Sequence, residues 1–273
     1  MRKIAAALSA LALAVSLAAC AEEGGTAQGD GSGGSEAANN LVALAKQVGD
    51  RTAESSTAHM VFTGGAGGVE VKGEGDIKVG GDNPSIKMDM DTGSMGTMSL
   101  VLLDGVLYMK LPAELSPGAK PWLKIDSKDK SNPMAQVLGS LTEQMRQNAD
   151  PRQALEQFQE AGTIESSAQE ELNGQQTTHY KITVDVQKLA ENQQDPTLKN
   201  AMQEAIKSGL KDFPVELWVD EEGLPVRMAI EMPTADPTSG KTVPVQVQVD
   251  YSNWGEPVDI QAPPADQVGE FPS

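Results

Sequence analysis

The stretch Val69-Glu-Val-Lys-Gly-Glu-Gly-Asp-Ile-Lys-Val79 alternates strictly between residues that favour burial and residues that favour water. Its odd-numbered positions are Val, Gly or Ile, whereas every even-numbered position is Glu, Lys or Asp. Successive side chains of a strand point to opposite faces, so this pattern predicts a strand with one apolar and one solvated face. Such strands belong to antiparallel sheets that are covered on one side only.

The same alternation recurs along most of the chain, and strand signals run from about residue 55 to residue 126. Further strand patterns lie at residues 86–90, 98–103, 106–111, 122–125, 180–186, 213–219, 224–232 and 243–251. Asp104-Gly105 separates two apolar runs and is typical of a two-residue hairpin turn. We therefore expect ten or eleven strands on one continuous pattern.

Helical periodicity appears in the first part of the chain and again in its middle. Residues 41–54 repeat apolar residues at helical spacing. Asn132-Pro133, Asp150-Pro151 and Asp195-Pro196 each combine an N-cap acceptor with proline at the first helical position, and apolar stripes follow them. The sequence thus predicts an α+β fold, in which helices cover the apolar face of a large curved antiparallel sheet.

The N-terminus has the three parts of an export signal. Arg2 and Lys3 precede an apolar run at residues 4–15, which is too short to span a bilayer. Leu17-Ala-Ala-Cys20 follows and resembles a lipobox, which implies acylation of the Cys20 thiol and cleavage before this residue. We expect the mature protein to be held by acyl groups on the extracytoplasmic face of the cell membrane.

Composition divides the chain into four regions. Residues 1–19 form the expected signal peptide, and residues 20–40 form a tether that contains six glycines and no large apolar residue. Such a composition cannot bury enough surface to offset chain entropy, so we expect the tether to be disordered. Residues 41–267 form a single domain, and residues 268–273 a flexible tail.

The charge balance excludes some partners. The chain has 21 basic and 39 acidic residues, and removal of the signal peptide takes away Arg2 and Lys3. The mature charge is thus near −20, which argues against nucleic acid as a partner. With Cys20 as its one cysteine, the chain forms no internal disulfide. No pattern calls for a cofactor or a metal.

Three segments in the C-terminal half carry a family resemblance. They are Val215-Glu-Leu-Trp-Val-Asp220, Gly223-Leu-Pro-Val-Arg227 and Asp250-Tyr-Ser-Asn-Trp-Gly-Glu-Pro-Val258. Together with Asp104-Gly-Val-Leu-Tyr108 and Trp122-Leu-Lys-Ile125, they resemble the LppX/LprAFG family of bacterial lipoproteins. The resemblance covers roughly residues 41–265.

The resemblance implies a half-barrel sheet around helices, with an apolar cavity between them that holds acyl chains. It also implies that the protein carries or presents lipids or lipoglycans in the cell envelope, with an unidentified envelope transporter as a further partner. Gly73 and Gly75 leave gaps in the apolar face, and flexible methionines line much of it, as a cavity with a variable occupant requires. From the alternation we assign the cavity lining to Ile86, Met88, Met90, Met98, Leu100, Leu138, Leu141, Met202, Ile206, Met228 and Ile230.

Two other functions remain open. The same fold with a solid core would suit a protein-interaction, sensor or accessory lipoprotein. Met88, Met90, Met95 and Met98 are soft ligands of the kind that Cu(I) prefers, although the sequence places no histidine or cysteine beside them.

The histidines give little support to catalysis. His179 falls on the polar face of its strand beside Lys181, which predicts a solvated imidazole, and His59 is in phase with Val61, which allows burial. The sequence contains no G-x-S-x-G, H-E-x-x-H or P-loop motif. We therefore expect a protein that is not an enzyme.

Overall fold

The computed structural model describes residues 40–66, 69–79, 85–91, 93, 96–112, 120–126, 161–193, 196–235 and 242–270. Some predictions from the sequence lie outside these residues. They are the signal peptide, Cys20, the tether, and the helical stretches that begin near Asn132-Pro133 and Asp150-Pro151, with Leu138 and Leu141.

In the described part of the chain, twelve strands form one sheet in the order β12-β6-β5-β4-β3-β2-β1-β11-β10-β9-β8-β7. The strands are β1 (Thr57–Ala66), β2 (Val69–Lys78), β3 (Ser85–Asp91), β4 (Thr97–Leu103), β5 (Val106–Lys110), β6 (Trp122–Asp126), β7 (Gly162–Leu172), β8 (Gln175–Asp185), β9 (Asp212–Asp220), β10 (Pro225–Ala235), β11 (Thr242–Ser252) and β12 (Val268–Glu270). Neighbouring strands are antiparallel, except that β12 runs parallel to β6. The predicted antiparallel meander is confirmed, with β7 and β12 as strands that the alternation did not predict.

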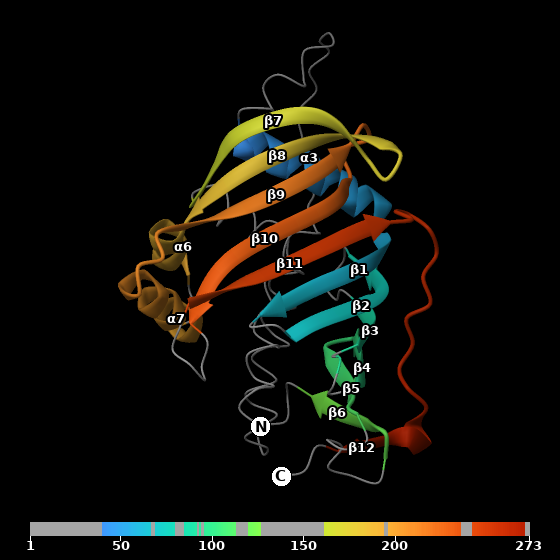
Figure 1. Ribbon diagram of the computed structural model, residues 1–273. Helices are drawn as coiled ribbons and strands as arrows, with labels where there is room; N and C mark the ends of the chain where they lie inside the picture. The colour runs from blue at the N-terminus through green and yellow to red at the C-terminus, as the bar shows by residue number, and fades with distance from the viewer. Residues whose placement is uncertain are drawn as a thin grey trace.

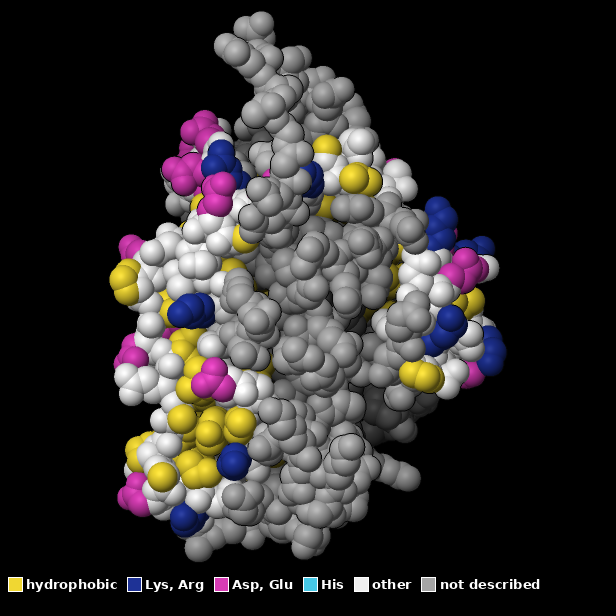
Figure 2. Space-filling view, turned by 180° about the vertical axis from the view of Figure 1, so that it is seen from behind, with side chains coloured by type: hydrophobic (Ala, Val, Ile, Leu, Met, Phe, Trp, Pro, Cys, Tyr) yellow, Lys and Arg dark blue, Asp and Glu magenta, His cyan; other side chains and the backbone are white. Residues whose placement is uncertain are grey.

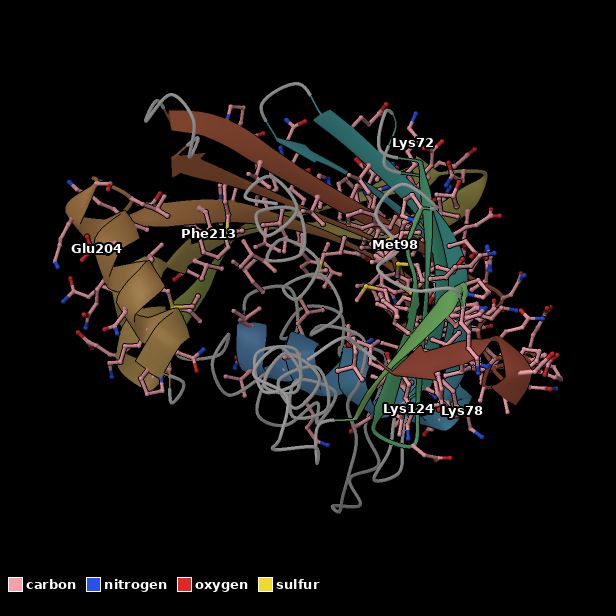
Figure 3. All side chains as sticks on the ribbon, turned by 90° about the horizontal axis from the view of Figure 1, so that it is seen from below. Lys72, Lys78, Met98, Lys124, Glu204 and Phe213 are labelled. Atoms are coloured by element: carbon pink, nitrogen blue, oxygen red, sulfur yellow. The ribbon has the colours of Figure 1, made fainter. Side chains whose placement is uncertain are left out.

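The sheet is strongly curved and does not close on itself, so the fold is an α+β half-barrel (Figure 1). Figure 3 looks along its inside, with Met98 and Phe213 inside the curve and Lys72 outside. Both glycines of β2 face this inside, where the backbone of β3 approaches closely. A Cβ atom on Gly73 would lie 2.9 Å from the carbonyl oxygen of Asp89, and one on Gly75 would lie 2.8 Å from the Cα atom of Met88.

These distances correct the interpretation of Gly73 and Gly75 as gaps that leave room for a ligand. The space that a side chain would occupy is taken by the backbone of β3. Glycine is needed at both positions because the backbone of β3 lies so close to β2 that a Cβ atom would force these strands apart.

Three helices and one 3₁₀ turn accompany the sheet in the described residues. They are α3 (Leu41–Ser55), α6 (Val186–Asn192), α7 (Pro196–Lys207) and η3 (Ala265–Gln267). The side chain of Asn40 caps α3 and accepts a hydrogen bond from Val42 N at 3.0 Å. The predicted helix at 41–54 is therefore confirmed, and α7 confirms the helix predicted after Asp195-Pro196.

The apolar residues on the inside of the half-barrel form two core clusters. The first cluster lies on β1 to β6 and β11 and contains Ala58, Met60, Phe62, Ile77, Val79, Ile86, Met88, Met90, Leu100, Leu102, Leu107, Met109, Ile125, Val245, Val247, Val249 and Tyr251. The second joins α3 and α6 to β7–β10 and contains Leu44, Val48, Ala161, Tyr180, Ile182, Val184, Val186, Leu189, Phe213, Val215, Leu217, Val219, Met228 and Ile230. Leu44 and Val48 of α3 thus belong to the same cluster as the inner-face residues of β8 to β10.

The C-terminal residues correct a second prediction. Residues 268–273 are predicted as a flexible tail, but Val268–Glu270 form β12 and pair with Trp122–Lys124 of β6. Residues 253–264 lead from β11 to this strand along the outside of the molecule (Figure 1). The Lys120 ammonium group donates a hydrogen bond of 2.8 Å to the carbonyl oxygen of Val268. The domain therefore extends at least to Glu270.

Candidate functional site

The predicted cavity lining falls into both core clusters rather than into one. Ile86, Met88, Met90 and Leu100 are buried in the first cluster, and Met98 is partly buried against it. Met228 and Ile230 are buried in the second cluster, while Met202 and Ile206 of α7 are partly buried against it. Leu138 and Leu141 lie outside the described residues. All the described members are thus apolar core residues or their direct neighbours.

Of the ten partly buried apolar residues that pack against the two clusters in the described part of the chain, nine lie at one end of the half-barrel, and the tenth, Trp254, lies at the opposite end beside Tyr251. We call the end with the nine residues the rim end; by the strand registers, β1, β3, β8 and β10 end there, and β2, β4, β9 and β11 begin there. The apolar rim consists of Leu41, Val71, Met98, Leu111, Ile164, Met202, Ile206, Leu210 and Met232. These side chains continue the apolar inner face outward to a place where it is only partly covered.

The strand registers explain why these residues lie at the same end of the half-barrel. Met98 pairs with Met90 near the end of β3, and Met232 pairs with Val245 near the start of β11. The two short helices α6 and α7 are inserted between the end of β8 and the start of β9, which brings Met202 to the same end. At the opposite end most apolar side chains of the inner face are buried, although Trp254 is only partly covered. Tyr251 is one of the buried residues, and its burial raises the pKa of its hydroxyl group.

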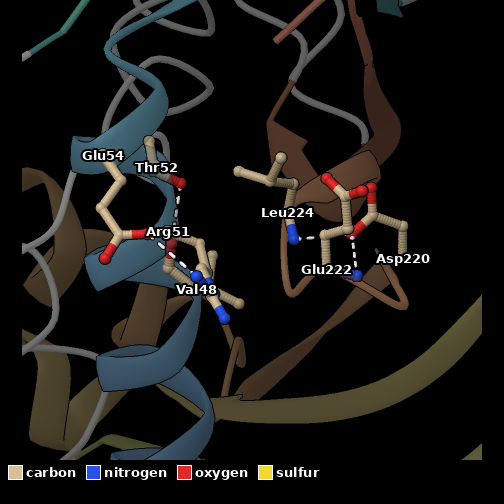
Figure 4. Close-up of polar contacts among 7 residues, drawn as sticks. All are labelled: Val48, Arg51, Thr52, Glu54, Asp220, Glu222 and Leu224. Atoms are coloured by element: carbon tan, nitrogen blue, oxygen red, sulfur yellow. Dashed lines mark hydrogen bonds and ion pairs between the residues drawn. The ribbon is translucent and has the colours of Figure 1, made fainter. Parts of the chain in front are cut away.

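The second half of α3 lies against the turn between β9 and β10 at this opposite end (Figure 4). Asp220 Oδ1 accepts hydrogen bonds from the backbone N–H groups of Glu222 at 3.0 Å and Leu224 at 2.8 Å. Gly223, between them, has a φ of +87°, and a Cβ atom there would lie 3.1 Å from Arg51 Cγ. The glycine of the Gly-Leu-Pro-Val-Arg segment thus allows both the turn and the close approach of α3.

The outer face carries a polar network that the sequence did not predict. His179 is on this face as predicted, but its exposed fraction is only 9%, so the prediction of a solvated imidazole is wrong. Its ring stacks on Trp218, with centroids 4.0 Å apart and planes inclined by 9°. The ring nitrogens lie 3.0 Å from a Glu216 carboxylate oxygen and 3.5 Å from one of Glu170. The neighbouring side chains therefore cover the histidine from its face and from both edges.

Trp218 extends this network toward β7 and β10. Its indole N–H donates a hydrogen bond to Glu170, and this bond is the main reason why the pKa of that carboxyl group is lowered. Arg227 lies over the Trp218 ring at 5.9 Å from the centroid and forms an ion pair with Asp250 of β11. Since both nitrogens of His179 already face carboxylates, the arrangement suits cross-strand stabilisation rather than proton transfer to a substrate.

His59 also lies on the outer face. Its Nδ1 atom is 3.0 Å from Asp76 Oδ1, and its neighbour in phase, Val61, is 41% exposed. The expectation that His59 could be buried is therefore wrong. Within the described ranges, no group of three His, Cys, Asp or Glu side chains is placed to hold a metal ion.

A pocket of about 290 Å³ lies on the outer face, between the sheet and the C-terminal segment. Lys87, Asp89, Ser99 and Trp122 line it together with residues 261–264. It is separate from the apolar rim, because Lys87 and Asp89 point away from the inside of the half-barrel.

Figure 2 views the molecule from behind. Hydrophobic side chains gather low on the side that carries β5, β6 and β12, and Lys, Asp and Glu side chains are scattered around them. Within the described part of the chain, every helix is too short or too polar to span a membrane.

No family model matches the chain. The chain is similar to a Streptomyces griseus protein described as "Uncharacterized 31.2 kDa protein in rplA-rplJ intergenic region", at 26% identity over 157 residues, or 56% of this chain. The chain spans about half (49%) of that protein's length. Among solved structures it is similar to LprF from Mycobacterium bovis, at a TM-score of 0.45 and 15% identity, over 83% of this chain and 99% of that chain.

Proposed function

We propose that this protein is a membrane-anchored extracytoplasmic lipoprotein that binds acyl chains on the inside of its half-barrel and carries or presents lipids or lipoglycans in the cell envelope. The observation that carries the proposal is the apolar inner face of the sheet, which ends in the apolar rim. Nine partly covered apolar side chains lie at the rim end, whereas Trp254 is the one such residue of the clusters at the other end in the described part of the chain. An elongated apolar ligand would enter at the rim end and lie along the strands.

Apolar burial alone would supply the affinity. Each methylene that leaves water contributes about 0.8 kcal/mol, so ten buried methylenes contribute about 8 kcal/mol. A net binding free energy of that size corresponds to a dissociation constant of about 1 μM, before the costs of association are subtracted. Two acyl chains would bind more tightly without any specific contact to a headgroup.

The methionines at the rim support such a ligand. Met98, Met202 and Met232 are partly buried, and their unbranched thioether side chains have many low-energy conformations. They can therefore repack around chains of different length or saturation. The resemblance of the Gly223–Arg227 and Asp250–Val258 segments to the LppX/LprAFG family favours the same function.

We further propose that the protein acts without catalysing a reaction, and that its membrane partner is reached through acyl groups on Cys20. His179 and His59, the two histidines of the chain, each lie beside a carboxylate on the outer face, away from the apolar rim. This placement favours a structural role for both side chains.

Native mass spectrometry of the full-length protein isolated from bacterial membranes would test lipid binding. The covalent anchor on Cys20 persists in the denatured protein, whereas a bound lipid adds mass only in the native spectrum and is identified after extraction. We expect one diacyl or triacyl lipid per chain. A native mass that equals the denatured mass, unchanged after incubation with envelope lipids, would instead favour the solid-core interaction protein.

A matched pair of variants on α7 would locate the ligand. Met202→Arg places a charge at the apolar rim, whereas Gln203→Arg places the same charge on an exposed neighbour. We expect Met202→Arg to lower the fraction of lipid-bound protein at least tenfold and Gln203→Arg to leave it unchanged. Equal lipid occupancy in the two variants would contradict entry at the rim end.

A further inference from the structure

The direction of α3 shows which end of the half-barrel is joined to the N-terminal segment. Helix α3 begins with Leu41, which belongs to the apolar rim, and its second half lies at the β9–β10 turn at the opposite end. The segment that joins Cys20 to the domain therefore attaches at the rim end. Leu41, where the described domain begins, and eight further partly covered apolar side chains thus lie at the same end of the molecule.

We propose that the apolar rim docks on the lipid bilayer, so that the open end of the half-barrel faces the membrane and the β9–β10 turn points away from it. The inference rests on the lipid anchor that the proposed function includes, but it does not depend on the presence of a bound lipid. The surface is defined by the nine residues of the apolar rim.

The length of the connecting segment favours this orientation. Twenty residues separate Leu41 from Cys20, and a flexible chain of that length has a root-mean-square span of roughly 25 Å. The fifteen residues of α3, which lead from the rim end toward the opposite end, extend over about 22 Å. With the opposite end against the bilayer, the segment would have to run back along α3 and would use most of its own span. With the rim end against the bilayer, the segment joins the domain at the end that already faces the membrane.

The distribution of charge favours it as well. Lysines occur around the rim end, although acidic residues such as Glu191, Glu204 and Asp212 are interspersed among them. These lysines are Lys72, Lys110, Lys188, Lys199, Lys207 and Lys211. The β9–β10 turn at the opposite end contains Asp220, Glu221 and Glu222 in succession. Anionic headgroups would therefore repel the opposite end more strongly than the rim end.

Partly covered apolar side chains gain most from the boundary between headgroups and acyl chains. Rim residues such as Met202, Ile206 and Leu210 come from α7 and the residues after it, so a short amphipathic helix would lie at the bilayer surface. A lipid that leaves the bilayer at this place would enter the apolar inner face without crossing water.

The single cysteine makes the orientation measurable in the full-length lipidated protein. Because Cys20 is the only cysteine and its thiol carries the anchor, an introduced cysteine is the only free thiol. Leu210→Cys places a probe in the apolar rim, and Glu222→Cys places the matched control in the β9–β10 turn. Denaturing mass spectrometry first confirms that each variant is acylated.

Each variant carries a fluorophore and is reconstituted in phosphatidylcholine vesicles that contain nitroxide-labelled lipid. We expect quenching at Leu210→Cys to exceed quenching at Glu222→Cys at least threefold. Equal quenching, or stronger quenching at Glu222→Cys, would overturn the proposal. Lys211→Cys, at an exposed position beside the rim, provides a second rim probe if Leu210→Cys folds poorly.

The other occupants of the rim would give different results. If a second copy of the chain or another segment of this chain covers the rim, the label at residue 210 is shielded equally in detergent and in vesicles, and nitroxide lipids leave it unquenched. That result would overturn membrane docking. The native mass of the same sample reports separately on the bound lipid, so failure of lipid binding and failure of the orientation are distinguishable.

Discussion

Gly75 of β2 and Met88 of β3 are direct partners in the sheet, and a Cβ atom on Gly75 would lie 2.8 Å from the Cα atom of Met88. The carbonyl group of Lys87 lies even closer to that position. Real Cβ atoms essentially never come so near to backbone atoms, and the close approach of β3 to β2 therefore depends on this glycine.

We predict that Gly75→Ala destabilises the fold by about 3 kcal/mol, because β3 must move away from β2 to accommodate the methyl group. Gly269→Ala is the matched control within a strand, where the nearest atom to the new Cβ is an ordinary 3.5 Å away. Urea unfolding of the two variants measures the difference. Equal stabilities would show that the sheet relaxes at this place without cost.

The attachment of α3 to the inner face gives a second prediction. Leu44 is 1% exposed and packs in the second core cluster, whereas Val42 on the same helix is 48% exposed. We expect Leu44→Ala to lower the free energy of unfolding by about 3 kcal/mol and Val42→Ala by less than about 0.5 kcal/mol. Thermal unfolding followed by circular dichroism checks both values, and similar losses for the two variants would contradict the packing of α3 described here.

Two glycines with a positive φ angle differ in whether α3 lies beside them. Gly223 and Gly174 have similar positive φ angles of +87° and +83°, but only Gly223 has α3 beside it, where an added Cβ atom would lie 3.1 Å from both Arg51 Cγ and Gln47 Nε2. Alanine should cost about 1 kcal/mol at either position because of the left-handed backbone. We expect Gly223→Ala to cost about 1 kcal/mol more than Gly174→Ala in urea unfolding, since the methyl group would also crowd α3. Equal costs would exclude a tight α3 contact.

The Glu170 carboxyl group should show its lowered pKa in solution. Because the hydrogen bond from Trp218 is the largest cause, Trp218→Phe should raise the pKa of Glu170 toward its ordinary value of 4.5. Trp122→Phe, which is distant in the sheet, should leave that pKa unchanged. Carbon-13 NMR of the glutamate carboxyl groups during an acid titration checks both variants.

The sign of the corresponding pH dependence follows from this lowered pKa. The carboxylate stabilises the folded state above about pH 4.5, and this contribution is lost as the pH falls through the lower pKa of the folded state. The unfolding free energy of Glu170→Gln should therefore fall less steeply with acid than that of the natural sequence. An unchanged slope would contradict the role of the Trp218 hydrogen bond.

The sequence predicted the strands that have one buried and one solvated face, because their side chains alternate. Residues 69–79 are such a case, and β2 occupies residues 69–78 of them. Strand β7 escaped prediction because it forms an edge of the sheet, and residues 165–171 are all exposed, so burial imposes no alternation there. Strand β12 has only three residues and is recognisable only through its pairing with β6.

The candidate site could be predicted only in part. Alternation placed Met88, Met90 and Met228 on the inner face correctly, but it contains no information on strand order or side-chain packing, and these residues fall into two clusters. It also placed His179 on the outer face without revealing its cross-strand partner Trp218, since that pairing depends on the register between β8 and β9. The apolar rim likewise emerges only when the ends of distant strands are brought together.

The most direct test of acyl-chain binding uses methyl NMR on the full-length protein with labelled methionine and isoleucine, titrated with a nitroxide-labelled fatty acid. Met98, Met202 and Met228 report on the inner face and its rim, and Ile260 of the outer C-terminal segment is the internal control. We predict saturable broadening of the three methionine signals at one fatty acid per chain, with Ile260 unaffected. No broadening of these methionine signals, or broadening equal to that of Ile260, would contradict a lipid-binding half-barrel.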